Sequence, residues 1–230
     1  MIFITGDTHC PYDMKKLNTT NFPQQKNLTK NDIVIVCGDF GLVWWPKDSK
    51  DYKSDLYWQK WLSEKPFTTL FVDGNHENHA MLAELQTEEK FGGIVGVVCD
   101  SVYHLKRGEI YTIEGKRFFC FGGARSSDRH QRVEGKSWWS EEMPSISEMN
   151  YGIDNLEKCG NEVDYIITHC CGTEIQKNIC DWYESDSLTQ FFKFIDNEVS
   201  FKHWYFGHYH DDKDIDDKHT CLYNTIVEVV

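Results

Sequence analysis

The stretch TLFVDGNHE, residues 69 to 77, contains both a structural and a chemical signal. Its first part, Thr69 to Val72, is a short apolar and β-branched run, which predicts a buried strand. Polar side chains follow at once, with a glycine among them that permits a sharp turn. The stretch therefore predicts a strand that ends in acid-base and metal-binding side chains, namely Asp73, Asn75, His76 and Glu77.

The same succession recurs at four other places in the chain. Each predicted strand is followed within a few residues by carboxylate or imidazole side chains: Asp7 and His9 after Ile2 to Thr5, Asp39 after Ile33 to Cys37, His169 after Tyr165 to Thr168, and His208 and His210 after His203 to Phe206. Ligands of open α/β sheets collect at the carboxyl ends of the strands. We therefore expect the five strand ends to converge on one cleft.

These side chains offer carboxylate oxygens, imidazole nitrogens and one amide oxygen, and they require no thiolate. The mixture suits Mn²⁺, Fe or Zn²⁺ better than Ca²⁺. Seven ligands are too many for one such ion and are suitable for two. Alternation along a strand would direct the imidazoles of His208 and His210 to the same side.

Other segments complete a mixed α/β pattern. Further strands are predicted at Ile94 to Val98, Ile110 to Ile113 and Arg117 to Phe121, with a hairpin signal at Glu114-Gly115 between the last two. Helical spacing predicts helices at Asp51 to Ser63, Asn78 to Leu85, Ser145 to Cys159 and Ser185 to Val199. Ser145 and Glu148 fit a capping box at the start of the third helix. This order of elements predicts a mixed α/β domain with packed sheets.

Length and composition favour one domain over residues 1–230, because 230 residues with 40% hydrophobic content can bury one sizeable core. The formal net charge of −13 opposes sequence-independent binding to nucleic acid. No run approaches the roughly 18 apolar residues of a membrane span, and the start of the sequence shows no leader pattern. We therefore expect a soluble, cytoplasmic protein without a membrane partner. Nine cysteines without a CxxC pair indicate reduced thiols.

The order of the motifs D-x-H, G-D, G-N-H-E, a single H and G-H-x-H resembles the calcineurin-like metallophosphoesterase superfamily, and the matched positions run from Asp7 to His210. The resemblance implies a small single-domain member with a sandwich of two mixed sheets, flanked by helices, and a dinuclear metal centre. It assigns Asp7, His9 and His210 to one metal, Asn75, His169 and His208 to the other, and Asp39 to both as a bridge. Mn²⁺ is the first choice for both ions, with Fe and Zn²⁺ as alternatives.

The resemblance also implies a reaction. Two ions would lower the pKa of a bridging water, so that metal-bound hydroxide attacks a phosphoester. His76 would stabilise or protonate the leaving oxygen. The alternative is a histidine that only orients the cluster. Glu77 is interpreted as a carboxylate at the start of a helix.

The sequence departs from the family pattern after Asp39. Many members carry a second aspartate, often followed by an arginine that grips the phosphate, where this chain has Leu42 and Val43. This departure argues against a close relative of the Ser/Thr protein phosphatases. Arg125, in a segment of glycines and hydroxyls directly after a strand, is the candidate substrate-binding cation. An ordinary polar loop is the alternative.

Three functions are compatible with these residues. The first is metal-dependent hydrolysis of a phosphomonoester or phosphodiester, with a small molecule or a protein as the substrate. The second is a scaffold of the same fold that binds proteins and has little activity, which the filled ligand positions and His76 disfavour. The third is a nuclease of the same superfamily, which the net charge disfavours.

Two tryptophan pairs, Trp44-Trp45 and Trp138-Trp139, admit two interpretations. They could line an aromatic wall for a flat substrate group. The more usual role of such residues is to cover a core edge or a subunit interface.

Overall fold

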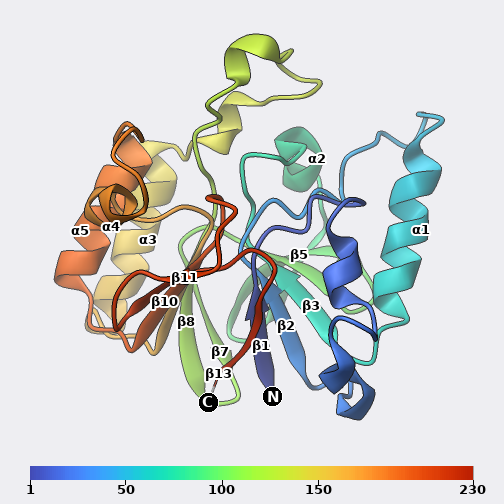
Figure 1. Ribbon diagram of the computed structural model, residues 1–230, viewed down its shortest axis with the longest axis horizontal. Coiled ribbons are helices and arrows are strands. Elements are labelled where there is room, and N and C mark those ends of the chain that lie inside the picture. Colours follow the sequence, from blue (N-terminus) through green and yellow to red (C-terminus); the bar gives the residue numbers. More distant parts are fainter. Residues whose placement is uncertain (230) are drawn as a thin grey trace.

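Two mixed β-sheets form the centre of the molecule and pack face to face (Figure 1). The computed structural model describes residues 1–229. The first sheet has seven strands, in the spatial order β13 (Ile226–Val229), β1 (Ile2–Thr5), β2 (Ile33–Val36), β3 (Thr68–Phe71), β6 (Val102–Leu105), β5 (Gly93–Cys99) and β4 (Thr87–Lys90). Strands β1, β2, β3 and β6 are parallel, whereas the pairs β13 with β1, β6 with β5 and β5 with β4 are antiparallel.

The second sheet has six strands, in the spatial order β11 (Lys213–Asp214), β12 (His219–Cys221), β10 (His203–Phe206), β9 (Tyr165–Thr168), β8 (Lys116–Phe121) and β7 (Glu109–Ile113). Strands β12, β10, β9 and β8 are parallel, and the two edge strands pair antiparallel to them. Because parallel strands end at the same edge of a sheet, each sheet gathers several carboxyl ends in one place.

Helices cover the outer faces of both sheets. Figure 1 shows α3, α4 and α5 on one side of the sandwich and α1 on the opposite side. The helices are α1 (Tyr52–Ser63), α2 (His79–Ala83), α3 (Ile146–Lys158), α4 (Thr173–Ile179) and α5 (Ser187–Glu198), with short 3-10 helices at η1 (Met14–Leu17), η2 (Pro23–Asn27), η3 (Arg129–Gln131) and η4 (Ser140–Glu142). Within residues 1–229, no helix combines the length and apolar character needed to cross a bilayer.

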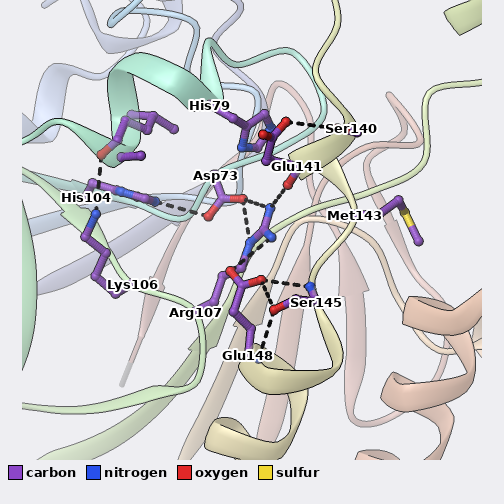
Figure 2. Close-up of a pocket in the computed structure, with 12 residues that line it drawn as sticks. Asp73, His79, His104, Lys106, Arg107, Ser140, Glu141, Met143, Ser145 and Glu148 are labelled. Atoms are coloured by element: carbon purple, nitrogen blue, oxygen red, sulfur yellow. Dashed lines mark hydrogen bonds and ion pairs between the residues drawn. The ribbon is translucent and has the colours of Figure 1, made fainter.

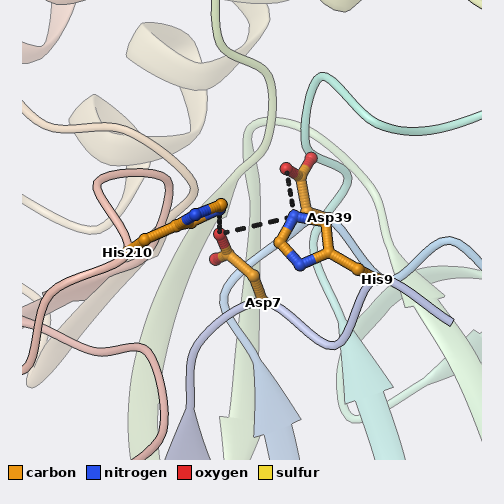
Figure 3. A group of neighbouring side chains, drawn as sticks. All are labelled: Asp7, His9, Asp39 and His210. Atoms are coloured by element: carbon orange, nitrogen blue, oxygen red, sulfur yellow. Dashed lines mark ion pairs between the residues drawn. The ribbon is translucent and has the colours of Figure 1, made fainter. Parts of the chain in front are cut away.

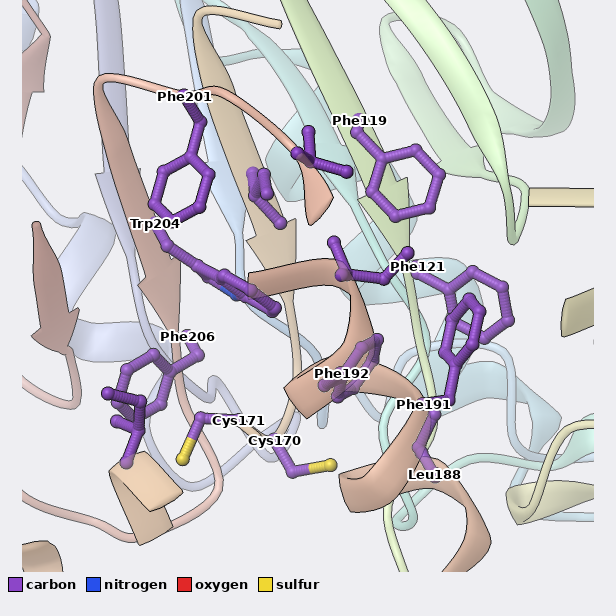
Figure 4. Packing of buried hydrophobic residues seen from close by; sticks show 14 of the residues in the cluster. Phe119, Phe121, Cys170, Cys171, Leu188, Phe191, Phe192, Phe201, Trp204 and Phe206 are labelled. Atoms are coloured by element: carbon purple, nitrogen blue, oxygen red, sulfur yellow. The ribbon is translucent and has the colours of Figure 1, made fainter. Parts of the chain in front are cut away.

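Strand alternation explains how the sandwich is held together. Ile2 and Ile4 of β1 belong to the cluster between the sheets, together with Ile167 of β9, whereas Phe3 packs outward with residues of η1 and with Phe22, which directly precedes η2. On the other outer face, Phe121 and Trp204 pack against Phe192 of α5 (Figure 4). Each fully buried side chain of this kind contributes about 1.5–3 kcal/mol. The sheets are thus fixed from both faces, which gives the strand ends a rigid base.

Every strand predicted from the sequence forms, within one residue of its predicted bounds. The hairpin between β7 and β8 is confirmed, and both turn residues have positive φ, 49° at Glu114 and 76° at Gly115, as a type I′ turn requires. The predicted helices form within two residues of their bounds, and the capping box of Ser145 and Glu148 is present. The sandwich of two mixed sheets flanked by helices is therefore confirmed.

The expectation that His208 and His210 share one face of a strand is wrong. Strand β10 ends at Phe206, and φ is 70° at His208 and 51° at His210, which is left-handed backbone. The ring of His208 packs beside His169 at 5.0 Å, and the ring of His210 packs beside His9 at 4.9 Å. The two imidazoles are directed by a loop to different neighbours.

Candidate metal centre and active site

Backbone hydrogen bonds join the loops that follow the strands. The N–H groups of Thr8 and His9 donate to the carbonyl oxygen of Asp39 at 3.1 and 2.8 Å, which joins the loop after β1 to the loop after β2. In the second sheet, the N–H of Gly207 donates to the carbonyl oxygen of His169 at 2.9 Å. The candidate site residues therefore lie on loops that support one another.

Two glycines allow candidate ligands to approach the backbone closely. A Cβ atom at Gly74 would lie 2.1 Å from Asp39 Oδ1, and one at Gly207 would lie 2.1 Å from Asp7 Oδ1. Both distances are far below van der Waals contact. Any larger residue at these positions would displace a carboxylate, so the glycines are required by the position of the acids.

Four of the predicted ligands form a compact cluster at the strand ends (Figure 3). Asp7, His9, Asp39 and His210 each offer one ligand atom, and these atoms lie within 4.8 Å of one another. His9 Nε2 is 3.2 Å from Asp39 Oδ2, and His210 Nε2 is 3.2 Å from Asp7 Oδ2. Two carboxylates and two imidazoles in this arrangement suit a divalent transition metal.

One carboxylate oxygen in this cluster lies 3.2 Å from His210 Nε2 but accepts no hydrogen bond from the described part of the chain. Asp7 Oδ2 is buried and accepts no hydrogen bond of normal geometry from any residue in the range 1–229. An unsatisfied buried polar group costs about 1–3 kcal/mol, and more when it is charged. A bound cation would remove this cost, so the residues present fit a metal ion.

Asp39 faces both groups of predicted ligands. Its Oδ2 atom faces His9, while its Oδ1 atom lies 3.2 Å from His169 Nε2. The Oδ1 atom also accepts the backbone N–H of His76 at 2.7 Å, which fixes the carboxylate plane. A ligand shared by two ions needs this intermediate position.

The second predicted group is Asn75, His169 and His208. His169 Nδ1 lies 2.7 Å from the carbonyl oxygen of Cys37, an acceptor, so Nδ1 carries the proton and Nε2 is turned toward the site. Asn75 Oδ1 is 3.2 Å from that Nε2 atom. Burial, followed by the charge of His169, lowers the pKa of His208 to about 3, so His208 is neutral and able to bind a metal.

The buried carboxylates of Asp7 and Asp39 need positive charge beside them. Burial raises the pKa of Asp7 and Asp39, but the facing histidines, above all His169, outweigh burial and hold both pKa values below the usual range. Burial lowers the pKa of His169, and the two carboxylates outweigh it and raise that pKa to about 10. Two ionised carboxylates in a buried site are stable only with paired cations, a role that metal ions can fill.

Backbone strain is concentrated at the candidate ligands. φ is positive at His9 and Asp39, 35° and 44°, as it is at His208 and His210. A non-glycine residue in such a conformation costs of order 1–3 kcal/mol and persists only where its surroundings fix it. The fold therefore holds these side chains in place at an energetic cost, as functional sites commonly do.

His76 lies at the edge of the cluster, beside His9, with a ring separation of 5.5 Å. The guanidinium of Arg132 lies against its ring, with Nη1 3.2 Å from Nδ1 and Nη2 3.1 Å from Nε2. Burial lowers the pKa of His76, and Arg132 adds to this effect while Asp39 opposes it. His76 is therefore a neutral imidazole at the open side of the site.

Three arginines occupy the segment after β8, and two of them, Arg125 and Arg132, differ in environment. The Arg132 side chain is 17% exposed and is held by Asp128 Oδ2 at 2.8 Å. The predicted substrate-binding residue, Arg125, is 39% exposed, and its guanidinium is 3.8 Å from Glu184. Arg125 lines a cavity together with Asn75, a position compatible with substrate binding. Its substrate-binding role stays a prediction. Arg132 could not be predicted from the sequence, because it lies well beyond the strand end and in no motif.

Asp13 was also missed. Its Oδ2 atom lies 2.9 Å from His9 Nδ1 and accepts the hydroxyl of Tyr223 at 3.2 Å. An acceptor at Nδ1 turns Nε2 toward Asp39 and fixes the tautomer of the ring. Only its position four residues after His9 could have suggested this contact.

Glu77 does not lie at the start of a helix, which corrects the sequence-based interpretation. Helix α2 starts at His79 with Asn78 as its N-cap. Glu77 is buried and accepts the backbone N–H groups of Phe40 at 2.7 Å and Gly41 at 3.1 Å. Burial, followed by Asp39, raises its pKa to about 8. Glu77 thus joins the loop after β3 to the loop after β2.

A buried charged cluster supports the loop that carries Asn75 and His76 (Figure 2). Asp73 Oδ2 accepts Arg107 Nε at 2.9 Å and Nη2 at 2.5 Å, and Asp73 Oδ1 is 3.1 Å from His104 Nε2. Burial raises the pKa of Asp73, but Arg107 outweighs it and holds that pKa well below the usual range. The cluster fixes the end of β3 directly before the candidate ligands.

Comparison with known proteins agrees with this geometry. A sequence model of the family described as calcineurin-like phosphoesterase matches residues 1–212. Part of the chain is similar to lariat debranching enzyme A of Xenopus laevis, with 28% identity over 140 residues that make up 57% of this chain and 25% of the relative. The chain thus spans about a quarter of the length of that curated relative.

Proposed function

The chain belongs to the calcineurin-like phosphoesterase family, and on this premise we propose that it hydrolyses phosphoesters with the help of two bound metal ions. The observation that carries the proposal is the convergence of two buried aspartates and two histidines, Asp7, Asp39, His9 and His210, within 4.8 Å. Mn²⁺ is the proposed metal, because the donors are oxygen and nitrogen without thiolate.

Each candidate ligand has a proposed place. One ion would be held by Asp7, His9 and His210, the second by Asn75, His169 and His208, and Asp39 would contact both. Its two oxygens face the two groups at 3.2 Å each, to His9 and to His169, which supports the bridging role.

When bound, the ions would supply Lewis-acid chemistry that activates water and neutralises charge on the phosphate. His76 would donate a hydrogen bond to the departing oxygen, because its imidazole lies beside His9 and is not among the candidate ligands. Arg132 would bind a phosphate oxygen at the same edge, because its guanidinium already lies at His76. Asp13 would hold His9 in its ligand orientation.

The test is a hydrolysis assay of the purified chain with bis(p-nitrophenyl) phosphate and p-nitrophenyl phosphate. We expect activity with added Mn²⁺, loss of activity with a chelator and recovery on reloading. Loss of a group that merely orients a ligand costs about 10–100-fold, so Asp39→Asn should lower kcat/KM by at least about 100-fold. The matched control is Asp100→Asn, an exposed aspartate outside the site.

Metal content gives a second measurement of the same proposal. Elemental analysis should find about two ions per wild-type chain and fewer in Asp39→Asn. Hydrolysis that is insensitive both to the chelator and to Asp39→Asn would contradict the proposal.

A second candidate function is cleavage of nucleic acid, which the partial similarity to a lariat debranching enzyme favours. The net charge of −13 opposes it, because phosphate-backbone binding depends on Lys and Arg. Cleavage of a lariat or linear single-stranded RNA by the Mn²⁺-loaded chain, lost in Asp39→Asn, would support this candidate. Absence of both cleavage and salt-sensitive binding would exclude it.

A further inference from the structure

The candidate metal centre lies where two cavities meet. One cavity, of about 590 Å³, contains Arg125, Ser127 and Arg129, and is called here the polar cavity. The other, of about 610 Å³, contains Tyr12, Trp44, Trp45 and Tyr223, and is called here the aromatic cavity. His76 and His210 line both.

The candidate ligands are divided between these cavities. Asn75 and His208 line the polar cavity, whereas His9 lines the aromatic cavity. A phosphate at the metal centre would therefore have an open cavity on each side. Each cavity has the size of an ordinary ligand pocket, about 300–1,000 Å³, and exceeds the needs of a phosphate group alone.

The walls of the aromatic cavity are fixed in position. Trp44 packs edge-on against the buried Trp139, with ring centroids 5.5 Å apart and an interplanar angle of 89°. The backbone N–H groups of Trp44 and Trp45 both donate to Asp55 Oδ2, at 2.8 and 2.9 Å. Tyr223 stacks on His210 at 4.6 Å and 13°. Rings held by such contacts lose little entropy on binding.

Large aromatic surfaces in this cavity remain accessible. Trp45 is 37% exposed and Tyr12 is 80% exposed. Exposed rings beside a reaction centre suit a flat aromatic group of a substrate, because stacking of that group on the rings increases the affinity. Of the two interpretations of the tryptophan pairs, Trp139 has the packing role and supports Trp44 in the wall.

The polar cavity has a different chemistry. Guanidinium and hydroxyl groups of Arg125, Ser127 and Arg129 line it, together with carboxylates such as those of Glu184 and Asp186 and with Trp182, which stacks on Tyr183 at 4.1 Å. Such donors suit a polar substituent such as a sugar. The two cavities therefore offer two different environments on opposite sides of one phosphate position.

From these features we infer that the substrate is a phosphodiester that carries a flat aromatic group, such as the base of a nucleoside, in the aromatic cavity. The inference rests on the proposed function. A monoester has one substituent and would leave one cavity to solvent, whereas a diester has two and can occupy both. In the reaction, the oxygen of water bonds to phosphorus, one phosphorus–oxygen ester bond breaks, and a proton goes to the departing alcohol oxygen, so that a monoester and an alcohol form.

The experiment compares three substrates of the Mn²⁺-loaded chain by chromatography of the products. They are the methyl diester of thymidine 5′-phosphate, the methyl diester of 1,2-dideoxyribose 5-phosphate, which has hydrogen in place of the base, and thymidine 5′-phosphate, a monoester. We expect kcat/KM for the thymidine diester to exceed that for the abasic diester about tenfold, as stacking of one base implies. The monoester should be the poorest substrate.

Two substitutions of Trp45 test whether the base binds in the aromatic cavity. Trp45→Ala should lower kcat/KM for the thymidine diester about tenfold, which removes the preference for the base, and Trp45→Phe should retain most of it. Tyr57→Ala, which removes an exposed aromatic ring on α1 outside both cavities, should leave the preference intact.

Several results would overturn the inference. Equal kcat/KM for the thymidine and abasic diesters in the wild-type chain would do so without any variant, as would a monoester that reacts as fast as the diester. A base preference that persists in Trp45→Ala would place the base elsewhere. Failure to hydrolyse even bis(p-nitrophenyl) phosphate would instead overturn the proposed function, and the inference with it.

Discussion

At the scale of single residues, Arg132 and Arg125 offer a direct comparison. Arg132 is largely buried against His76, while Arg125 is exposed and paired with Glu184. A charge-assisted hydrogen bond is worth about 1.5–3 kcal/mol, so Arg132→Ala should lower kcat/KM for bis(p-nitrophenyl) phosphate about tenfold or more. Arg125→Ala, the matched variant, should have a smaller effect. If Arg125→Ala lowers kcat/KM more than Arg132→Ala does, the substrate-binding residue is Arg125.

His219 gives a pH-dependent prediction away from the site. Burial lowers its pKa, but Asp196 and Asp216, at 3.3 and 2.8 Å, outweigh burial and raise the pKa above 6.5. Its stabilising contribution is therefore complete below pH 6.5 and is lost as pH rises through the raised value.

The loss of His219 should therefore matter more in acid than in base. The difference in free energy of unfolding between wild type and His219→Gln should be larger at about pH 5.5 than at about pH 9. Urea unfolding of both proteins at the two pH values measures it, with His130→Gln, an exposed histidine, as the control. A difference that grows with pH would contradict the assigned ion pairs.

Sequence alone identified the candidate ligands because each lies directly after a strand, in a short local pattern. Asp13 and Arg132 could not be found in this way, since their partners are set by loop geometry. The wrong expectation that His208 and His210 share one face of a strand has the same cause. Strand alternation applies only while the strand continues, and β10 ends at Phe206.

At the scale of elements, Arg107 joins the end of β3 to the start of α3. Its buried side chain bonds Asp73, and its Nη1 atom is 3.3 Å from Glu148 Oε1. Removal of one partner of a buried ion pair costs about 3–5 kcal/mol, because the other charge stays buried. Arg107→Ala should lower the free energy of unfolding by that amount, measured by urea denaturation.

The matched control for this change is Arg117→Ala. The pair of Arg117 with Glu162, at 3.5 Å, lies at the surface, with side chains 36% and 68% exposed. A surface pair contributes about 0–1 kcal/mol. Arg117→Ala should therefore lower the free energy of unfolding much less than Arg107→Ala. Equal losses would mean that the Asp73 cluster does not stabilise the β3 end as described.

The sequence did not reveal helix α4 or the strands β4, β6, β11, β12 and β13, and for β4 and β11 the reason is plain. Strand β4 has the sequence TEEK and is mostly exposed, so it has no apolar pattern, and β11 has two residues. Such strands exist because a neighbouring strand offers hydrogen bonds, and that pairing is long-range information. Strands such as β1, β2 and β9 were predicted because burial on both faces gives them continuous apolar runs, whereas β6 and β12 are also buried but mix apolar residues with a histidine.

At the scale of the whole molecule, metal binding should stabilise the fold. Ions that bind only the folded state, at about 100 times their Kd, add about 2.7 kcal/mol. For a chain of this size that corresponds to about 5–10 °C in the thermal midpoint. We expect Mn²⁺ to raise the midpoint of the wild-type chain, and a chelator to reverse the effect.

A single thermal transition would also support the prediction of one domain over residues 1–230, which the sequence suggested from its length. Asp7→Asn removes a buried candidate ligand and should respond little to Mn²⁺. Two separate transitions, of which only one shifts with Mn²⁺, would contradict the one-domain prediction.

The spread of the candidate ligands along the chain has a consequence for biosynthesis. Asp7 and His210 lie 3.2 Å apart in space, at His210 Nε2 and Asp7 Oδ2, yet about 200 residues separate them in sequence, which takes a ribosome about 10–40 s at about 5–20 residues per second. Strand β1 likewise cannot pair with β13, its antiparallel partner, until β13 has been synthesised. A nascent chain therefore cannot assemble the cluster until it has been translated past His210, and metal uptake would report that this length has been made.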